Sequence, residues 1–218
     1  MMKDLAEKFL SESDKRIIIE AVKTAEQKTS GEIVPLVVSA SGSYPLANVT
    51  GGAALAFLPA VSLTPWIGGF FWIGGQNMWM FLILFIAFFL LFRETVKRLA
   101  WLKRLFISKK EIEEEVHEAA VTSFFKEGLY RTRDANGILI FISVLEHKVW
   151  VLADKGINTR VPQSRWTGIV DGIIEGIKEN RQGAAICEAV MEVGGILSEH
   201  FPLKSDDTDE LKNLIVKD

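Results

Sequence analysis

Two aspartates, Asp134 and Asp154, are the side chains whose placement in the sequence best suits chemistry. Asp134 comes just before one run of apolar residues, and Asp154 directly follows the next. If these runs form an antiparallel hairpin, both carboxylates lie at the same end of a sheet. With an amide from Asn136 or Asn158 and backbone carbonyl oxygens, they would offer the oxygen ligands that Ca²⁺ and Mg²⁺ prefer. We predict a divalent-metal site here; the alternative is that Asp134 caps a turn and Asp154 simply ends a strand.

Three arginines accompany these aspartates. Arg131 and Arg133 precede Asp134, and Arg160 follows Asp154 by six residues. Guanidinium groups bind phosphate oxygens in pairs of hydrogen bonds. The three side chains could therefore hold a phosphate at the same end of the sheet, or they could be solvated loop arginines.

Other residues with reactive side chains have simpler interpretations. Glu146 and His147 resemble a catalytic pair, but they fall in the predicted hairpin turn at the opposite end from the aspartates, and we expect them on its surface. Cys187 is the only cysteine, which excludes an internal disulfide or a thiolate metal cluster. We expect it to behave as a small buried apolar residue. The sequence has no Walker loop, zinc-ligand spacing or dinucleotide-binding motif.

Charge is divided unevenly along the chain, although the formal net charge is only -3. Residues 93–110 carry seven basic residues and one acid, whereas residues 111–218 carry twenty acids and twelve bases. An acidic domain does not suit a phosphate backbone, so we expect no nucleic-acid partner.

A stretch of sixty residues, 33–92, contains no Asp, Glu, Lys, Arg or His. Within it, residues 78–92 are unbroken apolar sequence, and residues 47–73 form a weaker apolar segment. A helix needs about 20 residues to cross the hydrocarbon core. We predict a transmembrane helical hairpin with its turn at residues 74–77, and the lipid bilayer as a partner. Pro59 and Pro65 leave a re-entrant first segment as an alternative, and a buried helix of a soluble protein is another.

The basic segment 93–110 sets the predicted orientation. Lys and Arg next to a span remain on the cytoplasmic side, and the predicted turn has no charge to hold it there. We therefore expect a two-pass protein of the inner (cytoplasmic) membrane, with its soluble domain and both termini in the cytoplasm. The same segment carries Trp101 and Leu105, and it could lie along an anionic leaflet or form a solvated linker helix.

The hairpin interrupts a soluble domain. A helix over 11–28, capped by Ser11 or Ser13, and a strand over 32–38 come before it, and Pro35 predicts that this strand lies near a sheet edge or ends there. We expect residues 205–218 to be loosely ordered, apart from a turn that Leu211, Leu214 and Ile215 could form. The predicted elements after the hairpin are a helix from about 109, strands 138–143 and 149–153, and helices 164–180 and 184–200. The predicted division is 1–45, first part of the domain; 46–92, hairpin; 93–110, basic juxtamembrane segment; 111–203, remainder of the domain; and 204–218, acidic tail.

The sequence resembles the TPM domain family. The resemblance rests on three segments, SGEIV at 30–34, DANGILIFIS at 134–143 and EHKVWVLAD at 146–154. It covers residues 11–39 and 108–201, and the chain looks like a bacterial membrane-bound branch in which a transmembrane hairpin sits between the first strand and the second helix. The resemblance implies an α/β sandwich with a mixed sheet flanked by helices.

The resemblance also bears on the site. Some members of the family bind calcium near this sheet end and show weak acid phosphatase activity. By position, Asp134 matches the acidic residue before the family's Asn-Gly pair. Asp154-Lys155-Gly156 departs from the Gly-Tyr-Gly sequence that many members have there, which puts the geometry of a metal site in doubt.

Two functions follow as expectations. The first is a membrane-anchored binding or accessory module for membrane-protein assembly or quality control, with other membrane proteins as partners. The second is a divalent-metal-dependent phosphatase, using Ca²⁺ or Mg²⁺ at Asp134, Asn136 and Asp154. The sequence leaves open whether the chain forms homo-oligomers.

Overall fold

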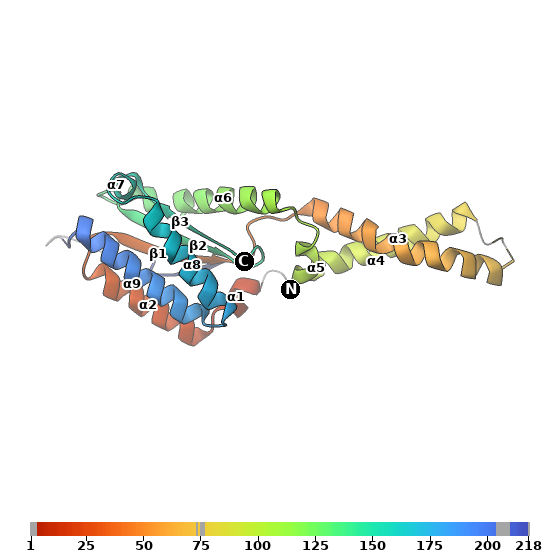
Figure 1. The fold of residues 1–218 in the computed structure, drawn as a ribbon, viewed down its shortest axis with the longest axis horizontal. Helices are drawn as coiled ribbons and strands as arrows, with labels where there is room; N and C mark the ends of the chain where they lie inside the picture. The colour runs from red at the N-terminus through yellow and green to blue at the C-terminus, as the bar shows by residue number, and fades with distance from the viewer. Residues whose placement is uncertain (1–3, 73, 75–76, 204–209, 218) are drawn as a thin grey trace. The chain divides into compact units, whose positions relative to one another are not determined.

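The structure, a computed structural model, describes residues 4–72, 74, 77–203 and 210–217. The chain divides into two compact units: Ser43–Ile112, here called the hairpin unit, and Lys3–Gly42 with Glu113–Asp218, here called the sheet unit. Figure 1 labels their helices and strands. The sheet unit is therefore assembled from two segments, one before and one after the hairpin unit in the sequence.

A four-stranded mixed sheet lies at the centre of the sheet unit. Its strand order is β3-β2-β1-β4, with β1 parallel to both β2 and β4, and with β2 and β3 antiparallel. All residues of β1 and β2 are buried, as expected for strands covered on both faces. The strands are β1 Glu32–Val38, β2 Gly137–Ser143, β3 Lys148–Ala153 and β4 Ile215–Lys217.

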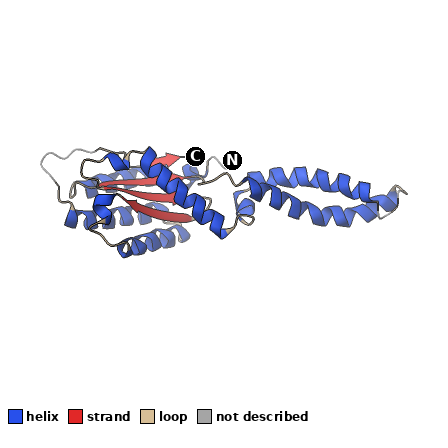
Figure 2. Cartoon of the chain, turned by 90° about the horizontal axis from the view of Figure 1, so that it is seen from above, coloured by secondary structure: helices blue, strands red, loops and turns tan. Residues whose placement is uncertain are grey.

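Helices cover both faces of the sheet, which confirms the predicted mixed-sheet α/β sandwich (Figure 2). On one face, α2 (Glu12–Glu26), α8 (Ser164–Lys178) and α9 (Gln182–His200) form an apolar core with alternate strand residues such as Ile33 and Ile140. Residues 113–126 of α6 (Lys109–Lys126) cover the other face, where the rings of His117 and Trp150 lie 5.0 Å apart. The shorter helices are α1 Leu5–Phe9, η1 Leu129–Arg131 and α7 Lys155–Asn158.

Serine side chains cap two helix starts, and Ser11 is one of the two predicted caps of α2. At α2, the Ser11 hydroxyl accepts a hydrogen bond from the Asp14 N–H at 3.1 Å, and the Asp14 carboxylate accepts one from the Ser11 N–H at 3.0 Å. At α6, the Ser108 hydroxyl accepts one from the Glu111 N–H at 3.1 Å. Each cap satisfies a backbone donor that has no partner inside the helix.

Two predictions about the sheet are wrong. β1 is not an edge strand, because β4 pairs with it on the side away from β2. Pro35 is tolerated because β4 pairs only with residues from Leu36 onward. The tail is not loosely ordered throughout, since Ile215–Lys217 form β4; three residues are too few to give a readable strand pattern.

The hairpin unit contains two helices that are long and apolar enough to cross a membrane, α3 (Pro45–Phe70) and α4 (Met78–Arg98). At 1.5 Å per residue they are about 39 and 32 Å long. α3 is one helix through Pro59 and Pro65, so the prolines do not interrupt the first segment. The Asn77 side chain caps α4 by accepting from two backbone N–H groups. Residues 75 and 76 of the predicted turn lie outside the described residues.

α3 and α4 pack against each other through the small side chains of α3. A Cβ at Gly52 would lie 3.0 Å from the Arg93 Cα, so the two backbones approach closely there. Small residues at helix contacts are typical of membrane helix pairs. The buried residues of α3 are Ala47, Gly51, Gly52, Ala56, Ala60, Thr64 and Gly68. Large apolar side chains remain exposed on both helices, among them Leu58, Trp66, Ile83, Ile86, Leu90 and Leu91.

Candidate functional site

The end of the sheet where β1 and β2 begin, here called the entry end, carries the predicted site residues. Asp134 precedes β2, and Asp154 follows β3, whose last residue, Ala153, pairs with Ile138. The Asp154 N–H also donates to the Gly137 carbonyl at 2.9 Å. The hairpin register therefore puts both aspartates at one end, as the sequence predicts.

A pocket of about 300 Å³ opens at the entry end, here called the Asp134 pocket. Arg160 is held beside it, because its guanidinium donates to the His200 carbonyl at 2.8 Å and lies over the Phe201 ring at 4.6 Å. The buried Ser30 hydroxyl has no hydrogen-bond partner among the described residues. The pocket thus combines a carboxylate, a guanidinium and an unused hydroxyl. Its lining residues are Ser30, Asp134, Arg160, His200, Phe201, Pro202 and Leu203.

The parallel pairing of β1 and β2 assembles this pocket from distant segments. The Asn136 side-chain amide donates to the Ser30 carbonyl, and the Glu32 N–H donates to the Asn136 carbonyl at 3.3 Å. The Ser30 N–H and the Thr29 hydroxyl both donate to the Phe201 carbonyl, at 3.0 and 2.6 Å. The loops before both strands are therefore tied to the end of α9.

Asp154 lies outside the lining of the Asp134 pocket and begins α7. Its Oδ1 accepts from the Lys155 N–H at 2.6 Å, while its Oδ2 is buried with no partner among the described residues. The first turn of α7 lies against the loop that precedes β2. A Cβ at Gly156 would come within 2.5 Å of the Ala135 carbonyl oxygen and 2.9 Å of the Asp134 carbonyl oxygen. A partnerless carboxylate oxygen suits a hard cation such as Ca²⁺ or Mg²⁺.

The side chains of the two asparagines are held through their amide nitrogens. The Asn136 amide nitrogen is engaged with Ser30, and the Asn158 amide nitrogen donates to the Ala153 carbonyl at 2.7 Å. Within the described residues, no group of three or more His, Cys, Asp or Glu side chains is arranged to hold a metal. A metal at Asp134, Asn136 and Asp154 stays a prediction, and Asp154 Oδ2 is the ligand atom that the structure favours.

The three predicted arginines are not together. Arg160 lines the Asp134 pocket, whereas Arg131 and Arg133 do not. The Arg131 Nε donates to the Tyr130 hydroxyl at 2.8 Å, and its guanidinium lies over the same ring. A phosphate in this pocket would therefore meet Arg160 and the Ser30 hydroxyl. Sequence reasoning missed Ser30 as a site residue, although it opens the SGEIV segment and lies just before the strand that pairs with β2.

At the opposite end of the sheet, the prediction that Glu146 lies on the surface of the hairpin turn is wrong. Glu146 is only 1% exposed. Its carboxylate accepts from the Ser41 N–H at 2.9 Å and from the Ser143 hydroxyl, and the Ser41 hydroxyl donates to Ser143 Oγ at 2.8 Å. The carboxylate is buried because these donors replace water. Glu146, Ser143 and Ser41 are here called the Glu146 network.

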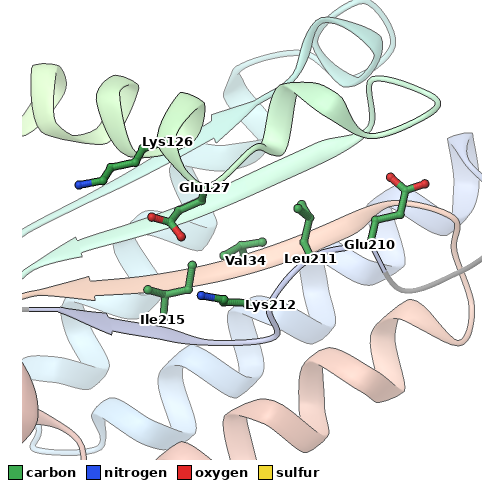
Figure 3. Close-up of a pocket in the computed structure, with 7 residues that line it drawn as sticks. All are labelled: Val34, Lys126, Glu127, Glu210, Leu211, Lys212 and Ile215. Carbon is green, nitrogen blue, oxygen red and sulfur yellow. The ribbon is translucent and has the colours of Figure 1, made fainter.

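A larger cavity, of about 610 Å³, lies over β1 between the end of α6 and the segment before β4 (Figure 3). Its charged lining residues are two lysines and two glutamates, Lys126, Lys212, Glu127 and Glu210. Lys217 also donates to the Glu127 carboxylate. With balanced charges and no unused buried donor or acceptor on its lining side chains in the described chain, this cavity favours neither an anion nor a cation.

An apolar groove of about 520 Å³ lies between α2 and α9, here called the α2–α9 groove. Ile17 and Met191 are exposed in it, and Glu20 and Glu188 lie along it. Cys187 also lines the groove. Burial raises the pKa of its thiol, and the carboxylates of Asp14 and Glu188 raise it further. The lining of this groove is therefore mostly apolar, with two glutamates as its charged residues.

The comparisons with known proteins agree with the fold. A search of curated proteins found no match. Among solved structures, the NMR structure of the BA42 protein from the psychrophilic bacterium Bizionia argentinensis aligns with a TM-score of 0.59 over 96% of each chain, at 20% sequence identity, which supports the fold alone. The family model of the TPM domain matches residues 100–196. Residues 100–196 are therefore similar to a TPM domain.

Proposed function

We propose that this chain is a membrane-anchored TPM-domain protein whose domain binds other membrane proteins and serves in their assembly or quality control. The observation that carries the proposal is the outer surface of α3 and α4, where large apolar side chains such as Leu58, Ile83 and Leu91 are exposed. An apolar surface of this extent suits lipid better than water. The hairpin unit would then be the anchor of the TPM domain.

Charge supports an arrangement with the domain in the cytoplasm of a two-pass inner-membrane protein. The hairpin is followed by seven basic residues in 93–110, whereas the region 71–77 carries no charge. Both ends of the hairpin would then lie on the cytoplasmic side.

The α2–α9 groove supplies a docking surface for such partners. Cytoplasmic flanks of membrane helices are enriched in Lys and Arg, and those that are amphipathic also present an apolar face. The groove is lined by apolar Ile17 and Met191 and by acidic Glu20 and Glu188, which complements such a segment.

Photo-cross-linking in membranes tests this function. A photoreactive amino acid at position 191 should give adducts with membrane proteins through their basic juxtamembrane segments, identified by mass spectrometry. Glu20→Lys/Glu188→Lys should lower the yield at least several-fold, because the groove loses its charge complementarity. The same probe at Tyr130, exposed outside the groove, is the matched control. Equal adducts at both positions, or adducts that ignore the charge reversal, would contradict the proposal.

A second function, a metal-dependent phosphatase, is favoured by the contents of the Asp134 pocket. Arg160 and the Ser30 hydroxyl could hold phosphate oxygens there. Bound Ca²⁺ or Mg²⁺ would offset the negative charge of the phosphoryl group. Asp134 lines the pocket and Asp154 lies at the same end of the sheet, so these carboxylates would supply ligands for the metal.

Calorimetric titration of Ca²⁺, Mg²⁺ and Mn²⁺ into the detergent-solubilised chain tests the second function. The phosphatase function requires binding that is lost in Asp134→Ala/Asp154→Ala, together with hydrolysis of a phosphate monoester. Arg160→Gln should weaken inhibition by inorganic phosphate, and Arg131→Gln, outside the pocket, should not. Absence of metal binding at millimolar concentration would remove this function and leave the docking function in place.

A further inference from the structure

The chain turns sharply where α4 ends. α4 stops at Arg98, and Leu99 is extended, with φ -97° and ψ 103°. The Leu99 carbonyl then accepts from the Lys103 N–H at 2.9 Å, which begins the short helix α5 (Ala100–Arg104). Because an extended residue separates them, α5 does not continue along the axis of α4.

α5 is fixed against the first turns of α3. A Cβ at Gly51 would come within 2.7 Å of the Phe106 ring, so the ring packs directly on the α3 backbone. Lys103, only 2% exposed, donates through its ammonium to the Ser43 carbonyl at 2.6 Å. Gly51 is six residues into α3, about 9 Å from its start. α5 therefore lies beside the end of the hairpin where α3 begins and α4 stops (Figure 1).

The opposite side of α5 is apolar and exposed. Trp101 is 66% exposed and Leu105 is 70% exposed. Side chains four residues apart lie on the same face of a helical turn, and Lys103, two residues from each, points the other way. Trp side chains are enriched where hydrocarbon meets headgroups.

Positive charge borders this exposed face. Arg93, Lys97 and Arg98 are exposed on the last turns of α4. The only acid among residues 93–110, Glu94, lies 3.9 Å from the Lys97 ammonium and 2.9 Å from the Arg98 Nε. Arg93, Lys97 and Arg98 therefore outnumber the one carboxylate among them, and the surface keeps a net positive charge.

We propose that α5 and the end of α4 form a binding surface for anionic phospholipid headgroups, with Trp101 and Leu105 inserted at the leaflet boundary and Arg93, Lys97 and Arg98 against lipid phosphates. The proposal rests on the membrane location under the proposed function. Each basic residue at an anionic membrane surface strengthens binding about fivefold. The surface would fix how deeply the hairpin sits in the leaflet and hold its end against the headgroups.

The test uses the full chain in nanodiscs. A Cys187→Ser, Leu105→Cys variant carries an NBD fluorophore at position 105, in discs of phosphatidylcholine alone or mixed with phosphatidylglycerol. Both discs contain equal amounts of a phosphatidylcholine with a nitroxide near its headgroup, which quenches a docked probe. We expect stronger quenching with phosphatidylglycerol. Lys97→Gln/Arg98→Gln should weaken docking on the order of tenfold.

Two controls separate the outcomes. Lys23→Gln/Lys28→Gln makes the same change in charge in the sheet unit and should leave the quenching unchanged. A probe at position 83, exposed on α4, should be quenched by a nitroxide deep in the acyl chain in both discs. If position 83 is not quenched, the membrane location itself fails. The α5 proposal is overturned if position 83 is quenched but position 105 is not. It is also overturned if the quenching at position 105 does not change with phosphatidylglycerol or with Lys97→Gln/Arg98→Gln. In both cases the proposed function stands.

Discussion

The two ends of the sheet differ in how fully their acidic side chains are hydrogen-bonded. At the end where β2 passes to β3, Glu146 is buried and accepts hydrogen bonds from Ser143 and Ser41. At the entry end, Asp154 has a carboxylate oxygen without a partner in the described chain, and Ser30 has a hydroxyl in the same condition. A carboxylate with all its donors in place stabilises the fold, whereas unused polar atoms beside a pocket are available to a ligand. We therefore expect the first end to stabilise the fold and the entry end to supply the proposed binding chemistry.

The largest expected effect is at the Glu146 network. Glu146→Ala leaves the Ser41 N–H and the Ser143 hydroxyl without their acceptor, and we expect a loss of about 3 kcal/mol in the free energy of unfolding. Glu146→Gln keeps one acceptor and should cost less. Chemical denaturation of the detergent-solubilised chain, followed by near-ultraviolet circular dichroism, measures both. A change below about 0.5 kcal/mol for Glu146→Ala would remove the structural role of this end.

A change at the entry end acts through backbone packing. Gly156→Ala places a Cβ within 2.5 Å of the Ala135 carbonyl oxygen, and we expect a loss of about 2 kcal/mol as the two loops separate. The matched control is Gly168→Ala on α8, where a Cβ meets open space. That change should stabilise the domain by about 0.5–1 kcal/mol through helix propensity. Equal effects from both substitutions would contradict the close contact between α7 and the Asp134 loop.

Substitution of one serine at each end of the sheet allows a direct comparison of the two ends. Ser143→Ala removes hydrogen bonds with Glu146 and Ser41, so it should cost about 1–2 kcal/mol. Ser30→Ala removes a hydroxyl that bonds to nothing in the described chain, so stability should change by less than about 0.5 kcal/mol. Thermal unfolding of the two variants side by side gives the difference. A larger loss for Ser30→Ala would reverse the roles of the two ends.

The smallest effect concerns Cys187, which belongs to neither end. Because its pKa is raised, less thiolate is present at mildly alkaline pH than in the unfolded chain, and alkylation should be slower. The rate plotted against pH should have its midpoint above that of the urea-unfolded protein. The stabilisation that the neutral thiol contributes is complete below the unfolded pKa and is lost as the pH rises through the folded one. Coincident midpoints would contradict the raised pKa.

Local pattern was enough to predict much of the fold. The apolar runs give β2, β3 and the hairpin helices, and the antiparallel register then puts Asp134 and Asp154 at one end. The burial of Glu146 could not be predicted, because an acid in a charged turn is ordinarily solvated. Its donor Ser41 is 105 residues away in the chain. Ser30 was missed for a similar reason, since its place beside Asn136 depends on the pairing of β1 with β2.

The interruption of the sheet unit by the hairpin has a consequence for synthesis. β1 and β2, paired along their whole length, are separated by residues 39–136. At about 5–20 residues per second, β1 leaves the ribosome roughly 5–20 s before its partner strand exists. The hairpin is synthesised during that delay, while an apolar strand has neither side paired, a state prone to aggregation. The yield of folded protein therefore depends on protection of β1 in the nascent chain as well as on the packing of the finished domain.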